Sequence, residues 1–130
     1  MKRKSTIIAL TLASVLLGAG CGSGGPAQHH VSGQVTFHGE PVPAGVIRFL
    51  PDTAQGNQGP AGYAPIEGGR YNTARSGRGT VGGPHSVVIS GYDGQPDPSG
   101  ESAHGAPLFA DHHTTADLPT TTTTLDFHLP

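Results

Sequence analysis

Histidine is the residue type in this chain that could most readily do chemistry, because two adjacent pairs stand in separate segments. His29 and His30 precede the first predicted strand, and Asp111, His112 and His113 precede the last. Neutral imidazole and carboxylate groups are ligands for Zn²⁺ and Cu²⁺. These five residues would form a metal site if the first and last strands were neighbours. The competing interpretation is that adjacent histidines point apart on a strand or lie in a solvated loop, since no His-x-x-x-His or Cys-His spacing is present.

The other polar motifs lack the spacing that their chemistry needs. Asp93, Asp97 and Glu101 do not follow the EF-hand order, and prolines interrupt them. The glycine-rich segment 77–83 leads into a proline and a strand, whereas a phosphate cradle needs a helix and a lysine. No serine lies in a G-x-S-x-G elbow. We therefore assign no catalytic residue and no cofactor.

Cys21 is the only cysteine among the 130 residues. It follows a basic start at residues 2–4, an apolar run at 7–17 and the small residues Gly18, Ala19 and Gly20. The apolar run is shorter than the ~20 residues that a membrane-spanning helix needs, but it suits an export signal. An exported chain with one thiol cannot form an internal disulfide, so a modified thiol explains the residue better than a free one.

This beginning resembles a bacterial lipoprotein signal. Ala19, Gly20 and Cys21 match that pattern, whereas Gly18 occupies the place of its leucine, and Leu17 stands one residue too early. The resemblance implies cleavage before Cys21, fatty acids such as palmitate on its thiol, and a membrane anchor facing the periplasm or the exterior. Gly22 in place of aspartate favours the outer membrane. Ordinary secretory cleavage is the alternative.

The charge and composition of the chain exclude several partners. Three of the seven basic residues lie at positions 2–4, whereas all nine acidic residues follow Cys21. A domain that is negative overall is a poor ligand for nucleic acid, which needs clustered lysine and arginine. A small molecule or sugar is also disfavoured, because the chain has no tryptophan and only Tyr63, Tyr71 and Tyr92 for stacking.

Apolar residues recur with period 2, which is typical of β-strands. The pattern predicts strands at 31–37, 45–50, 63–66, 70–73, 86–90 and 120–129. Turns are expected at 38–41 and 67–69, and a long irregular excursion at 91–107. No helix is predicted. About seven short strands in roughly 100 residues indicate a β-sandwich.

Four short motifs strengthen this interpretation. They are V-x-G-x-V-x-x-x-G-x-P-V at 31–42, G-x-[VI]-x-F-x-P at 45–51, G-x-Y at 69–71 and G-x-H-x-V-x-I at 83–89. In this order they resemble the carboxypeptidase regulatory-like, or transthyretin-like, domains of small bacterial envelope lipoproteins. The resemblance implies a seven-stranded, Greek-key, antiparallel β-sandwich of the prealbumin or Ig-like kind. It implies no catalysis. Transthyretin-like hydroxyisourate hydrolases end in Tyr-Arg-Gly-Ser, which this chain lacks.

Together these features predict a signal peptide at 1–20, a flexible Gly/Ser-rich tether at 21–29 and a β-sandwich domain at 30–130. The expected function is that of a lipid-anchored module of the cell envelope with a structural or protein-binding role, whose partners are the membrane and envelope proteins. A strand edge could accept a strand from such a partner. The alternative function is a periplasmic metal-handling protein that uses the paired histidines.

Overall fold

The computed structural model describes residues 26–130. Cys21 and the predicted signal peptide lie outside these residues. The described part is all-β, with one 3-10 turn at Thr53–Gln55 and no α-helix. None of its helical segments has the length and hydropathy needed to span a membrane.

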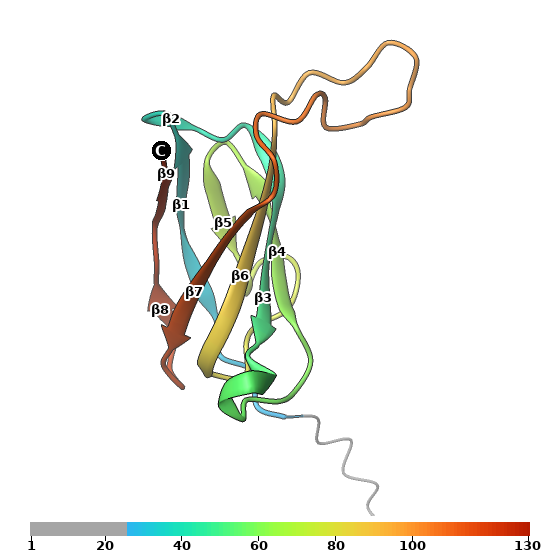
Figure 1. Cartoon of the computed structure of the whole chain (residues 1–130). Helices are drawn as coiled ribbons and strands as arrows, with labels where there is room; N and C mark the ends of the chain where they lie inside the picture. The colour runs from blue at the N-terminus through green and yellow to red at the C-terminus, as the bar shows by residue number, and fades with distance from the viewer. Residues whose placement is uncertain (1–25) are drawn as a thin grey trace, which may run out of the picture.

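Nine strands form one curled sheet (Figure 1). The strands are β1 (Val31–Phe37), β2 (Glu40–Pro41), β3 (Ala44–Pro51), β4 (Gly62–Glu67), β5 (Arg70–Asn72), β6 (Gly83–Tyr92), β7 (His112–Leu118), β8 (Thr123–Thr124) and β9 (Phe127–Leu129). The order across the sheet is β2-β1-β5-β4-β3-β6-β7, and β8 and β9 also pair with β1. Consecutive pairs are antiparallel, whereas β1 runs parallel to β8 and β9.

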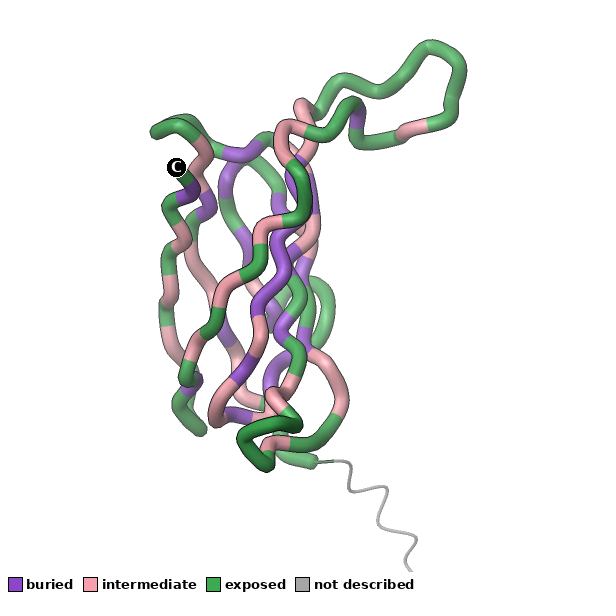
Figure 2. The backbone as a smooth tube through the Cα atoms, viewed as in Figure 1, coloured by how far each residue is buried: buried purple, intermediate pink, exposed green. Residues whose placement is uncertain are grey.

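The period-2 alternation that predicts the strands also determines which side chains form the core. On β3, Ile47 and Phe49 are fully buried, whereas Arg48 is exposed. The inward side chains of the other strands pack around this pair. The burial colours of Figure 2 alternate along β3 and β4, whereas β6, which lies between β3 and β7, is buried at most of its positions. The buried cluster consists of Val31, Val35, Val42, Ile47, Phe49, Ala64, Ile66, Tyr71, Val87, Ile89, Leu118 and Leu129.

Two tight turns are confirmed, and their backbone explains their sequences. His38 and Gly39 have φ of 52° and 79°, and Gly68 and Gly69 have φ of 55° and 76°. Two consecutive residues with positive φ form the turn whose twist matches that of paired strands. These turns set the register of β1 with β2 and of β4 with β5.

The structure corrects the predicted strands at four places. Glu40–Pro41, predicted within a turn, form β2, and the strand predicted at 86–90 extends over Gly83–Tyr92 as β6. No strand was predicted at β7, because Leu118 is the one large apolar side chain among its inward residues His112, Thr114, Ala116 and Leu118. The single strand predicted at 120–129 is interrupted, since only residues 123–124 and 127–129 pair with β1. Its alternation is nevertheless confirmed, because Leu125, Phe127 and Leu129 face the core.

The predicted tether at 21–29 ends within the domain. The backbones of His29 and Thr80 exchange two hydrogen bonds of 2.8 and 2.9 Å, and the Gln28 side chain accepts a hydrogen bond from the Gly79 amide. Beyond β6, residues 93–106 project from the end of the fold opposite to His29 (Figure 1), and the chain returns to the body where Pro107 pairs with Tyr92. This excursion agrees with the predicted irregular segment and is braced by backbone bonds between Asp93 and Ala106 and between Asp97 and Ser102.

Candidate functional site

The most distinctive surface lies where the curled sheet remains open, between β7 and β9. Among residues 26–130, β7 pairs only with β6, and β9 pairs only with β1. Each strand therefore has a second edge without a partner strand in this part of the chain. Unpaired edges are templates for strand addition, and proteins usually cover or blunt them.

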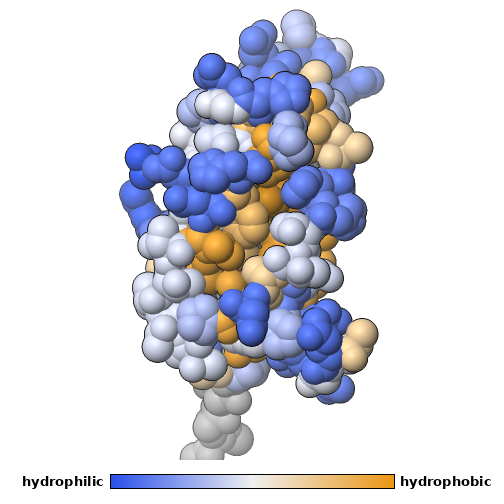
Figure 3. Space-filling view, turned by 60° about the vertical axis from the view of Figure 1, so that its left-hand side comes forward, coloured by the Kyte–Doolittle hydropathy of each residue, from blue (hydrophilic) through white to orange (hydrophobic). Residues whose placement is uncertain are grey.

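Apolar side chains lie between these two edges. We call this surface the seam and define it by Phe37, Phe109, Ala116, Leu125 and Phe127, all of which are partly buried against the core. The rings of Phe37 and Phe109 are 4.9 Å apart between centroids. In the space-filling view of Figure 3, hydrophobic atoms run down the middle of this side between two hydrophilic margins. A continuous apolar strip with polar margins is typical of an interaction surface.

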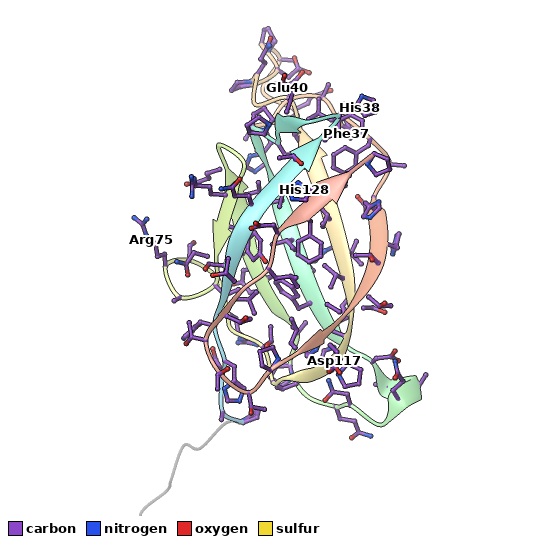
Figure 4. All side chains as sticks on the ribbon, turned by 90° about the vertical axis from the view of Figure 1, so that its left-hand side faces the viewer. Phe37, His38, Glu40, Arg75, Asp117 and His128 are labelled. Carbon is purple, nitrogen blue, oxygen red and sulfur yellow. The ribbon has the colours of Figure 1, made fainter. Side chains whose placement is uncertain are left out.

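The margin formed by residues 123–129 is held to β1 by close packing and hydrogen bonds. The Leu125 amide donates to the Ser32 carbonyl at 2.8 Å, and the Gln34 amide donates to Asp126 Oδ1 at 2.8 Å. A Cβ atom on Gly33 would lie 2.0 Å from the Leu125 carbonyl oxygen, so only glycine permits this approach. In Figure 4, His128 faces outward on this margin, where its Nδ1 lies 2.9 Å from Thr36 Oγ1.

Tyr71 secures the same margin from inside the sheet. Its hydroxyl donates a 2.5 Å hydrogen bond to the Leu125 carbonyl, and its ring lies 6.3 Å from that of Phe127. Burial raises the pKa of the Tyr71 hydroxyl well above its usual value, and the Asp126 carboxylate raises it further. Tyr71 therefore remains a neutral donor in the folded protein.

Replacing Tyr71 with phenylalanine should lower the free energy of unfolding by about 1 kcal/mol at neutral pH, because one buried hydrogen bond is lost. The native protein should also lose stability as the pH rises above about 10, since only unfolded Tyr71 then ionises. The variant lacks this contribution, so the gap between the two proteins should shrink in alkali. Urea unfolding of both proteins at neutral and alkaline pH measures the effect, and a gap that widens in alkali would contradict it.

The five residues of the metal hypothesis do not form one site. The first and last strands are neighbours, as that hypothesis required, but Asp111, His112 and His113 lead into β7 instead of the last strand. β7 starts at the end of the fold near the excursion, whereas His29 and His30 precede β1 at the other end (Figure 1). Within the described range, no three His, Cys, Asp or Glu side chains gather closely enough to hold a metal ion.

Each of these residues has a structural environment of its own. Asp111 accepts a 2.7 Å hydrogen bond from Ser90 and lies 3.5 Å from Arg48, at the surface. His112 and His113 alternate along β7, so His112 faces inward and His113 is exposed. His30 Nδ1 lies 3.3 Å from Thr73 Oγ1. The acidic residues of the excursion are also engaged locally, since Asp93 and Asp97 accept backbone hydrogen bonds within their own turns.

A hollow lies on the outer face of β1 and β5, on a different part of the surface from the seam. It has a volume of about 690 Å³ and is widely open to solvent. Glu67 and Asp126 mix with Arg70 and Arg75 along its walls, and Arg75 extends away from the body in Figure 4. Mixed charges on an open wall do not single out one ligand, whereas binding sites for small molecules are enclosed and mostly apolar.

His85 is the residue of chemical interest that the sequence did not reveal. It faces the core on β6 and is 1 % exposed. Its Nδ1 lies 2.8 Å from the Gly83 carbonyl, so this nitrogen carries the proton, and its buried Nε2 has no partner in the described part of the chain. The sequence holds one sign of its burial, because His85 has the same parity along the strand as Val87 and Ile89, which face the core.

We compared the chain with protein-family models, with curated proteins and with solved structures, and none of them matches it.

Proposed function

We propose that this protein is a lipid-anchored, non-catalytic module of the bacterial cell envelope whose β domain binds other proteins. The observation that carries the binding role is the seam, in which apolar side chains lie between two unpaired strand edges. Such an arrangement suits recognition of an extended strand, since main-chain hydrogen bonds supply affinity and the apolar strip supplies side-chain contacts.

The anchoring role rests on the residues around Cys21. A basic start, a short apolar run and small residues before a lone cysteine are the features that a lipoprotein signal combines. More than one acyl chain gives a stable membrane anchor, because each buried CH₂ contributes about 0.8 kcal/mol. The described chain starts at one end of the fold and the excursion projects from the other (Figure 1). An anchor at Cys21 would therefore place the excursion, and the end of the seam that contains Phe37, on the side of the domain remote from the bilayer.

We also propose that the curled sheet is a two-layered, Greek-key sandwich related to the carboxypeptidase regulatory-like domains. The four motifs that support this relationship fall on β1 and its turn to β2, on β3, on β5 and on β6. This is the part of the chain in which the sequence pattern and the strands agree most closely.

Replacing Cys21 with serine tests the anchor. In cells fed a labelled fatty acid, the variant should carry no label, and it should retain residues 1–20 because the lipid-dependent cleavage fails. The control is Ser23→Ala, which removes a neighbouring hydroxyl and should be labelled and processed like the native protein. Membrane fractionation alone is a poor readout, since an uncut apolar segment can still hold the variant on the membrane. A Cys21→Ser chain that still takes up label would contradict the proposed anchor.

A further inference from the structure

The exposed face of β7 carries a charge pattern that bears on what occupies its free edge. His113, Thr115 and Asp117 are exposed and lie on one face, opposite Val88, Ser86 and Pro84 of β6. Neither His113 nor Asp117 has an ion-pair partner among residues 26–130, where the single salt bridge joins Arg48 and Asp111. One strand thus presents an imidazole and a carboxylate, each two positions from Thr115.

This spacing is self-complementary. If two copies of β7 pair antiparallel about a two-fold axis at Thr115, His113 of each copy lies opposite Asp117 of the other. Opposite charges on directly facing residues stabilise an antiparallel pair, and like charges destabilise it. A two-fold axis also requires that the same surface serve both copies. We propose that the free edge of β7 binds β7 of a second copy of this chain in this register.

Charge also decides against the neighbouring registers. An axis at Thr114 would place Asp111 opposite Asp117, which brings two carboxylates together. An axis at Ala116 would place His113 opposite Pro119, where proline has no amide proton to donate to a ladder. Of these three registers, the one centred on Thr115 alone pairs the His113 imidazole of each copy with the Asp117 carboxylate of the other.

The inward face of β7 is compatible with this pairing. The axis at Thr115 places Thr114 of one copy opposite Ala116 of the other, and both side chains are small and half-buried. The two seams then lie on either side of the axis, so each copy helps to cover the apolar strip of the other. Figure 4 shows Asp117 near the end of β7 that is remote from Phe37, so the paired edge runs along much of the seam.

This inference rests on the proposed binding role of the seam side, and it names the partner as a second copy. It does not depend on acylation of Cys21. An experiment can therefore disprove the pairing of two copies and leave the lipid anchor unaffected. The reverse also holds.

A cross-linking experiment on the full-length protein in its own envelope tests the register. In Thr115→Cys, the two introduced thiols would face each other across the axis, where facing residues of a strand pair have Cα separations of about 4.5–5.5 Å, within the range of a disulfide. Mild oxidation should convert most of this variant to a covalent dimer on a non-reducing gel. Thr121→Cys, an exposed threonine beyond β7, and the native chain should remain monomeric.

The charge pair is tested in the same Thr115→Cys background. His113→Asp places two carboxylate pairs across the axis. The initial rate of cross-linking should fall at least about fivefold, which is the effect of losing two pairs of about 0.5 kcal/mol each before any repulsion is added. The double swap of His113→Asp with Asp117→His restores complementarity and should recover the rate. A dimer yield no higher than that of Thr121→Cys, or a double swap no faster than His113→Asp, would overturn the inference. Cross-linking of Thr115→Cys to a different envelope protein would overturn the second-copy assignment while supporting the binding role.

Discussion

Replacing Gly33 with alanine is expected to detach the C-terminal margin and to lower the free energy of unfolding by at least about 3 kcal/mol. The added Cβ would lie 2.0 Å from the carbonyl oxygen of Leu125 and 2.7 Å from its carbonyl carbon. Both atoms belong to the backbone, so no side-chain rotation relieves the clash. Residues 123–129 must move away from β1, which breaks the hydrogen bond from Leu125 to Ser32 and the one from Tyr71 to Leu125.

Two measurements check this expectation. Urea unfolding gives the loss of stability, and hydrogen exchange should show faster exchange of the Thr123 and Leu125 amides in the variant. The matched control is Ser32→Ala on the same strand, whose side chain makes no hydrogen bond in the described structure and whose change should stay within about 0.5 kcal/mol. Equal stability of Gly33→Ala and the native protein would show that the margin does not pack against β1 as described.

Replacing Phe49 with alanine should cost about 3–5 kcal/mol, the range for removing a buried aromatic side chain. Phe49 is fully buried on β3, between β4 and β6, and its ring lies 6.0 Å from that of Tyr71. The core has few large side chains to close around the cavity. Because a small domain is stable by only about 5–15 kcal/mol, this one change should remove a large share of the total.

The neighbouring residue supplies the control. Leu50 follows Phe49 on the same strand but is 40 % exposed, so Leu50→Ala should change the free energy of unfolding by only about 0.5 kcal/mol. Phe49 and Leu50 lie on opposite faces of β3, so the two variants compare a change on the buried face with one on the exposed face. Similar losses for both would contradict the inward orientation of Phe49.

The sequence predicted the strands whose side chains alternate between large apolar and polar residues. Residues 31–37 and 45–50 follow this rule. Of their apolar faces, the structure buries Val31, Val35, Ile47 and Phe49 fully and Phe37 in part. The same rule missed β7, because only one of its inward side chains, Leu118, is large and apolar, and the strand pairs with β6 through its backbone. A strand that is held by backbone hydrogen bonds shows no apolar alternation in its sequence when few of its inward side chains are large and apolar.

The candidate site was less accessible to prediction than the fold. The seam depends on which strands stay unpaired, and that is a property of sheet order and not of any local motif. Leu125 and Phe127 belong to the apolar alternation of the strand predicted at 120–129, but nothing in the sequence indicates that they border an open side. The paired histidines lie apart for the same reason. His112 and His113 belong to β7, and the start of β7 lies at the end of the fold remote from His29.

The proposed function requires a lipid on Cys21, and this can be measured directly on the native protein. The intact mass of the membrane-extracted chain should correspond to residues 21–130 with acyl chains on Cys21. A mass equal to that of all 130 residues without modification, or that of a cleaved chain with a free thiol, would contradict the lipid anchor on which the proposed function depends.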